Sequence, residues 1–114
     1  MFDFQKLTVY QKSKSYNFEI NGLLESIKFE RHVVDQLKRA SFSIMLNIAE
    51  GTSRYSTKDK RNFFIISRGS AFECVAILEF LFENNKIDEK TYINLLSKLE
   101  EISKMLFALI KSLE

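Results

Sequence analysis

The fold is decided by residues 36–51, which read QLKRASFSIMLNIAEG. The apolar residues in this run recur at spacings of three and four, as they do on one face of an α-helix. Small polar residues stand at positions where a plain helix would carry leucine. A second run, RGSAFE at residues 68–73, repeats this feature. Neither run holds a recognisable set of catalytic groups, so the spacing predicts a helical bundle and no activity.

The composition fits a single all-α domain that spans residues 1–114. A chain of 114 residues can bury one core and is too short for two domains. It contains no proline and only three glycines, so few residues oppose long helices. No secretory signal and no membrane-spanning run is visible. The lone cysteine, Cys74, cannot form an internal disulfide, which favours a cytoplasmic location and a buried apolar role for this residue.

The apolar periodicity predicts four helices, over residues 8–27, 31–50, 57–83 and a fourth that begins near Asp88. Their connections are short, which makes successive helices antiparallel neighbours in an up-down-up-down four-helix bundle. Residues 1–7 form a short N-terminal arm. We expect Gly51 to end the second helix in a left-handed conformation. Ser56 and Asp59 form a capping box at the start of the third helix.

Polar and small residues within the helices call for structural roles. Asn47 falls on the core side of its helix, where an unpartnered amide costs roughly 1 to 3 kcal/mol. We therefore expect Asn47 to bond the backbone or a polar side chain near the loop at Gly51. Gly69 and Ser70 lower helix propensity in the middle of the third helix, which is understandable if a neighbouring helix passes close to them.

Glu73 is expected to be a buried structural carboxylate. On a helical projection it lies near Ile66 and Ile77, away from the charged strip of its helix. A carboxylate among apolar residues needs a cation, and Arg39 is the partner we expect. No second acid or base can be placed beside Glu73, so a structural ion pair is favoured over catalysis.

Residues 36–51, the loop TSRYSTKD and the run FFIISRGSAFE together resemble the signature of a known family. Its members are small four-helix bundle proteins first met as reading frames in intervening sequences of bacterial large-subunit ribosomal RNA genes, and related bundles are accessory factors of diversity-generating retroelements. The resemblance covers nearly the whole chain. The residues that carry it are Gln36, Leu37, Arg39, Ala40, Ser43, Ile44, Asn47, Ala49, Glu50, Gly51, Gly69, Ser70 and Glu73.

What the resemblance implies is an assembly and not an activity. It implies a four-helix subunit that joins others in a ring, with a pentamer favoured. It also implies that a reverse-transcriptase-like protein is a possible partner. Independently of it, Phe42, Leu46 and Ala49 point nearly opposite to the core residue Ile44, and the third helix is apolar nearly all round. Surplus apolar surface of this kind predicts a homo-oligomer.

Enzymatic chemistry is not expected, and no catalytic residue is assigned. His32 is the only histidine, and no glutamate precedes it at the spacing of a metal-binding helix pair. Arg31 stands directly before His32, which does not match the Arg-x4-6-His pattern of helical toxin ribonucleases. No glycine-rich phosphate loop is present. We expect no metal and no cofactor.

Basic residues are the remaining functional candidates. Residues 31–68 hold eight Lys or Arg against three Asp or Glu, whereas residues 69–114 hold five against eight. Cations at a helix-loop-helix junction can contact phosphates, and a tyrosine among them can stack on an unpaired base. The candidates are Lys38, Arg54, Tyr55, Lys58, Lys60, Arg61 and Arg68, with Arg39 beside them.

The sequence therefore leaves two hypotheses open. The first is a non-enzymatic, ring-forming bundle that binds RNA or DNA, or a protein that handles nucleic acid, through its basic face. The alternative is a purely structural or protein-interaction oligomer without a nucleic-acid role.

Overall fold

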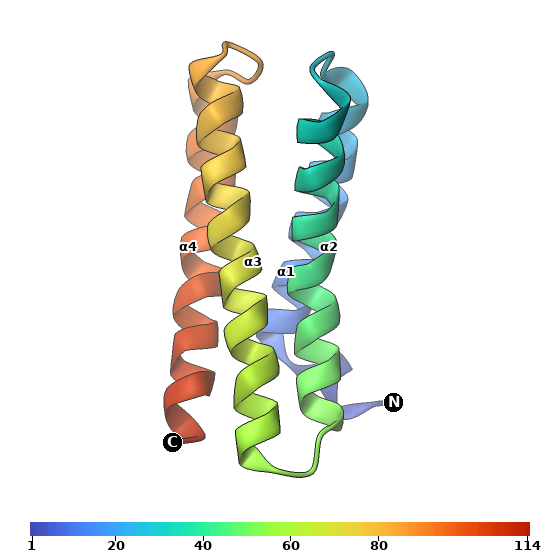
Figure 1. Ribbon diagram of the computed structural model, residues 1–114, viewed down its shortest axis with the longest axis vertical. Helices are drawn as coiled ribbons and strands as arrows, with labels where there is room; N and C mark the ends of the chain where they lie inside the picture. Colours follow the sequence, from blue (N-terminus) through green and yellow to red (C-terminus); the bar gives the residue numbers. More distant parts are fainter.

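Four α-helices run alternately up and down the long axis of the protein in the computed structural model, which describes residues 1–114 (Figure 1). They are α1 (Thr8–Ser26), α2 (Arg31–Ser53), α3 (Thr57–Glu83) and α4 (Glu89–Ser112), and a short 3-10 helix, η1 (Asp3–Lys6), precedes them. The bundle measures 44 × 23 × 22 Å. The predicted antiparallel four-helix bundle is confirmed.

The start of each of the two C-terminal helices is capped by a side chain. Ser56 Oγ accepts a hydrogen bond of 3.0 Å from the Asp59 backbone N–H at the start of α3, as predicted. Asp88 accepts one of 2.7 Å from the Thr91 N–H at the start of α4. Hydrogen bonding from the Thr91 side chain, and then from its backbone N–H, lowers the pKa of the Asp88 carboxyl. Such caps satisfy amides that have no partner inside the helix.

Gly51 does not end α2, so that prediction was wrong. The helix continues to Ser53, and no glycine in the chain has a positive φ. A Cβ at position 51 would lie 2.8 Å from Phe64 Cε1 and 3.2 Å from Phe63 Cβ. Glycine is needed here because α2 and α3 approach too closely for any side chain between them.

The core runs the length of the bundle. Leu37, Ile44, Leu78, Leu99 and Leu106 have no exposed surface. Serines at the helix interfaces satisfy their hydroxyls on backbone carbonyls, and Ser67 does so across the interface, on Ile44 O of α2, at 2.7 Å. Small side chains with satisfied hydroxyls allow close helix packing without a polar penalty.

Two titratable groups are buried in this core. Cys74 is fully buried, as predicted, and burial raises the pKa of its thiol to about 12. Burial also raises the pKa of the Tyr16 hydroxyl, which faces the Cys74 thiol. A thiol is a weak hydrogen-bonding group, and no conventional partner satisfies the Tyr16 oxygen.

Candidate nucleic-acid interface

The α2–α3 loop forms one end of the bundle, away from the α3–α4 turn (Figure 1). The chain leaves α2 at Arg54 and enters α3 after Ser56, and both residues have extended backbone conformations that reverse its direction. Tyr55 stands between them with its side chain fully exposed. An aromatic ring with no packing partner is free to stack on a base.

Four cations lie within six residues of Tyr55 along the chain, and two of them are held by neighbours. Arg54 Nη2 lies 3.0 Å from Glu50 Oε2, and its guanidinium covers the Phe63 ring at 4.5 Å from the centroid. Lys60 Nζ donates to the Thr52 carbonyl at 3.2 Å. These contacts fix the positions of both side chains, and Glu50 offsets part of the Arg54 charge.

The other two cations are unpaired. Lys58 and Arg61 lie on the first two turns of α3 and take part in none of the ion pairs of the protein. They are three residues apart, which places them on neighbouring positions of one helix face. The start of α3 adds the partial positive charge of a helix N-terminus. This end of the protein therefore favours an anion.

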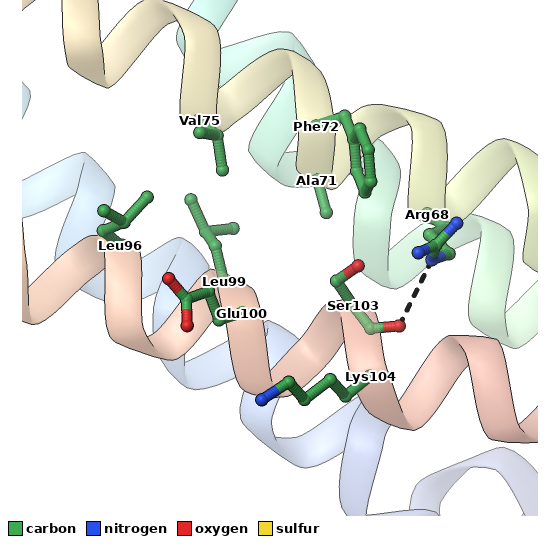
Figure 2. A pocket seen from close by; sticks show the side chains of 9 residues that line it. All are labelled: Arg68, Ala71, Phe72, Val75, Leu96, Leu99, Glu100, Ser103 and Lys104. Atoms are coloured by element: carbon green, nitrogen blue, oxygen red, sulfur yellow. Dashed lines mark hydrogen bonds between the residues drawn. The ribbon is translucent and has the colours of Figure 1, made fainter.

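Lys38 and Arg68 are not part of this group. Lys38 is exposed on α2, 16 residues before Arg54, which corresponds to about 24 Å along the helix. Arg68 turns toward α4, where its Nε donates to Ser103 O at 3.4 Å (Figure 2). Five predicted residues are thus brought together, and these two lie elsewhere. That any of them binds nucleic acid remains a prediction.

A polar seam joins α2 to α3 along their outer edge. Ser43 Oγ and Ser70 Oγ are 2.9 Å apart, which accounts for Ser70 in the middle of α3. Asn47 is partly buried and donates to Ser43 O and Ser43 Oγ, both at 2.9 Å. Asn47 thus bonds backbone and a polar side chain, as predicted, but the predicted location near the Gly51 loop was wrong, because its amide reaches one turn back along its own helix.

The expected Arg39–Glu73 pair is absent, so that prediction was also wrong. Glu73 is exposed, and its carboxylate accepts a hydrogen bond from Gln36 Nε2 of α2. Arg39 is exposed on α2 and forms no ion pair. Gln36 satisfies the carboxylate in place of Arg39.

A groove follows the opposite edge of α3, where it meets α4 (Figure 2). It consists of two adjoining hollows of about 390 and 500 Å³ that share Arg68 and Phe72. The Arg68 guanidinium lies 4.9 Å from the Phe72 ring centroid and 5.3 Å from that of Phe107. The sequence analysis missed this groove. The sequence did contain a sign of it. Phe72 follows Arg68 by one turn, on the face of α3 where charged residues are expected.

The sequence matches the model of the family that residues 36–73 resemble. The model of the 23S rRNA-intervening sequence protein family matches residues 5–108. The chain belongs to this family. No functionally curated protein matches the sequence.

A solved structure shows the same fold for a similar sequence. It is a crystal structure of a protein with unknown function from the S23 ribosomal protein family of Bacteroides thetaiotaomicron. The two sequences are 28% identical, with a TM-score of 0.87 over 91% of this chain and 99% of the other. The two proteins therefore share the four-helix fold over about nine-tenths of this chain.

The single histidine and the single cysteine of the chain stand apart from any cluster of metal-ligating side chains. No group of three or more His, Cys, Asp or Glu side chains is placed to hold a metal ion. His32 is exposed, 3.5 Å from Glu30. The Cys74 thiol is protonated at neutral pH, which makes it a poor nucleophile.

None of the helices is both long and apolar enough to cross a bilayer.

Proposed function

We propose that this protein is a non-enzymatic, ring-forming bundle that binds RNA or DNA through the end formed by the α2–α3 loop. The observation that carries the proposal is the fully exposed Tyr55 ring among four cations, Arg54, Lys58, Lys60 and Arg61. Between residues 50 and 61, four cations stand against the two carboxylates of Glu50 and Asp59. We call this group the basic tip.

The members of the basic tip have different tasks in this proposal. Lys58 and Arg61 contact phosphates, because their charges are not paired inside the protein. Arg54 and Lys60 are already positioned by Glu50 and the Thr52 carbonyl, so they add a fixed positive potential. Tyr55 stacks on an unpaired base, a contact that every base can make and that confers little sequence preference.

Assembly into a ring strengthens binding by repeating the basic tip. Apolar side chains remain exposed on all four helices, among them Phe18 of α1, Phe42 and Leu46 of α2, Phe72 of α3 and Phe107 of α4. Exposed apolar patches of this kind mark interfaces. Several linked tips on one nucleic acid gain effective concentration without any new contact. The number five for the ring rests on the family resemblance.

Salt dependence of binding tests the proposal. The logarithm of the binding constant should fall linearly with the logarithm of salt concentration, with a slope of roughly 0.9 per duplex phosphate neutralised. The double reversal Lys58→Glu with Arg61→Glu should weaken binding to all sequences alike and flatten that slope. Tyr55→Ala should weaken single-strand binding more than duplex binding.

A charge-matched control distinguishes binding by the basic tip from a general effect of the net charge of the protein. Lys86→Glu with Lys90→Glu makes the same change in charge at the α3–α4 turn, at the other end of the bundle. This pair should leave the salt slope unchanged. No binding by the wild type even at low salt would refute the proposal. The exposed apolar surfaces would then favour the second candidate, a protein-interaction oligomer whose partner could be a reverse-transcriptase-like protein.

A further inference from the structure

The outer surface carries an apolar ridge and an apolar groove on different sides of the bundle. The α2 ridge consists of Phe42 and Leu46, which are 46% and 44% exposed, with Arg39 one turn before them. The α3–α4 groove consists of Arg68, Gly69, Phe72, Glu100 and Phe107. Phe72 is 56% exposed and Phe107 41%. The first surface offers two exposed apolar side chains, and the second offers hollows in which such side chains can be buried.

Gly69 has no role within the subunit that explains it. Its φ is not positive, and a Cβ at this position would meet nothing within 4 Å. A neighbouring helix does pass close to Ser70, which bonds Ser43 of α2 as expected, but no helix of the subunit packs against Gly69. Glycine lowers helix stability, yet here it lies in the second hollow of the groove. A glycine at such a place allows a second molecule to approach the α3 backbone.

Hydrogen bonds across the helices put the ridge and the groove at the same level of the bundle. Ser43 of α2 bonds Ser70 of α3, and Arg68 of α3 bonds the Ser103 carbonyl of α4. Ser43 and Ser103 therefore lie at nearly the same height. Phe42 precedes Ser43 by one residue, so the ridge begins at the height of the groove.

The register continues along both helices, because α2 and α4 run in the same direction (Figure 1). Leu46 is three residues beyond Ser43, or about 4.5 Å along the axis. Phe107 is four residues beyond Ser103, or about 6 Å. A rotation about an axis parallel to the bundle keeps every residue at its height. Such a rotation brings the ridge of one copy against the groove of the next without sliding.

We propose that the α2 ridge of one subunit fills the α3–α4 groove of a second copy, head to tail. This proposal rests on the homo-oligomer of the proposed function and names the surfaces that form it. Because ridge and groove are different patches, the contact is heterologous, and a rotation without sliding lets repeated contacts of this type form a closed ring instead of a helical filament. Both apolar surfaces are then covered in every subunit.

The charges beside the two surfaces fit the same register. Arg39 lies four residues before Ser43, and Glu100 lies three residues before Ser103, so they are at about the same height. Arg39 and Glu100 are exposed, and neither forms an ion pair within the subunit. Docking of the ridge places Arg39 next to Glu100 of the partner subunit. A pair of opposite charges at this position fixes orientation and register.

Two matched glycine variants test the contact. Gly69→Phe fills the groove, and Gly22→Phe places the same side chain on α1, where a Cβ also meets nothing within 4 Å. Light scattering after gel filtration should give the oligomer for wild type and for Gly22→Phe. Gly69→Phe should give a folded subunit of 13.4 kDa with the helical circular dichroism spectrum of wild type.

A charge exchange tests the register. Arg39→Glu and Glu100→Arg should each raise the subunit dissociation constant about tenfold, and the double variant should restore it to within about threefold of wild type. An oligomer that survives Gly69→Phe, or a double variant no better than the single ones, would overturn this interface while leaving the ring itself standing. A monomeric wild type would instead refute the ring of the proposed function.

Discussion

Replacement of Gly51 by alanine should destabilise the protein, although alanine is the better helix former. The new Cβ would lie 2.8 Å from Cε1 of Phe64, a ring that is only 3% exposed and has little room to move. Overpacking of a core costs typically 1 to 3 kcal/mol, and the gain in helix propensity offsets about 1 kcal/mol of it. We therefore expect a net loss of about 1 kcal/mol in the free energy of unfolding.

Gly22→Ala is the internal control for this prediction. Both glycines are helical, but a Cβ at position 22 meets nothing, so only the propensity gain of about 1 kcal/mol remains. The two variants should differ by about 2 kcal/mol in urea unfolding followed by circular dichroism, at one protein concentration and with equal m-values. Equal stabilisation by both substitutions would show that α2 and α3 are not in tight contact at Gly51.

Three further substitutions probe the interior, the seam and a helix cap. Glu73→Ala should cost less than about 1 kcal/mol in thermal unfolding, because the carboxylate is exposed and loses a single surface contact with Gln36; a loss near 3 kcal/mol would restore a buried ion pair. Tyr16→Phe should leave stability unchanged or raise it by up to about 1 kcal/mol in urea unfolding, since it removes a buried hydroxyl without a partner. Asp88→Ala should lower the melting temperature at neutral pH. Because the folded pKa of Asp88 is lowered, its contribution is present above the ordinary Asp pKa and is lost as pH falls through the folded value, so the difference from wild type should vanish in acid.

Local signals predicted the helices well because they act over a few residues. The bounds of α3 follow from the Ser56 cap at one end and the loss of apolar periodicity at the other, and both signals are contained in the sequence around them. Arg54 and Tyr55 were therefore correctly placed in the connection before α3, although α2 ends three residues later than predicted. What the sequence does not contain is the distance between helices.

The errors arise where that distance decides the outcome. A glycine near a helix end serves equally well for a left-handed cap or for a close crossing, and only the position of Phe64 shows that Gly51 serves the crossing. Glu73 was assigned to the interior because it lies near Ile66 on the helical projection. Ile66 is itself 51% exposed, so the reference residue was on the outer surface.

The proposed interface and the basic tip are linked by symmetry. If subunits are related by rotation about an axis parallel to the bundle, every α2–α3 loop lies on the same rim of the ring. A long nucleic acid then meets several copies of Tyr55, Lys58 and Arg61 at once. Linked sites of this kind can strengthen overall binding by roughly 10²- to 10⁴-fold over one site.

Gly69→Phe should therefore weaken binding of a long single strand by at least about tenfold, although Gly69 lies about two turns of α3 from Arg61 and touches no phosphate. Binding of an oligonucleotide too short to reach a second tip should not change, because each basic tip stays intact. Gly22→Phe should bind both ligands like wild type. Fluorescence anisotropy with the two lengths measures both effects. If Gly69→Phe dissociates the ring but leaves affinity for the long strand unchanged, the tips act one at a time and assembly serves some purpose other than binding.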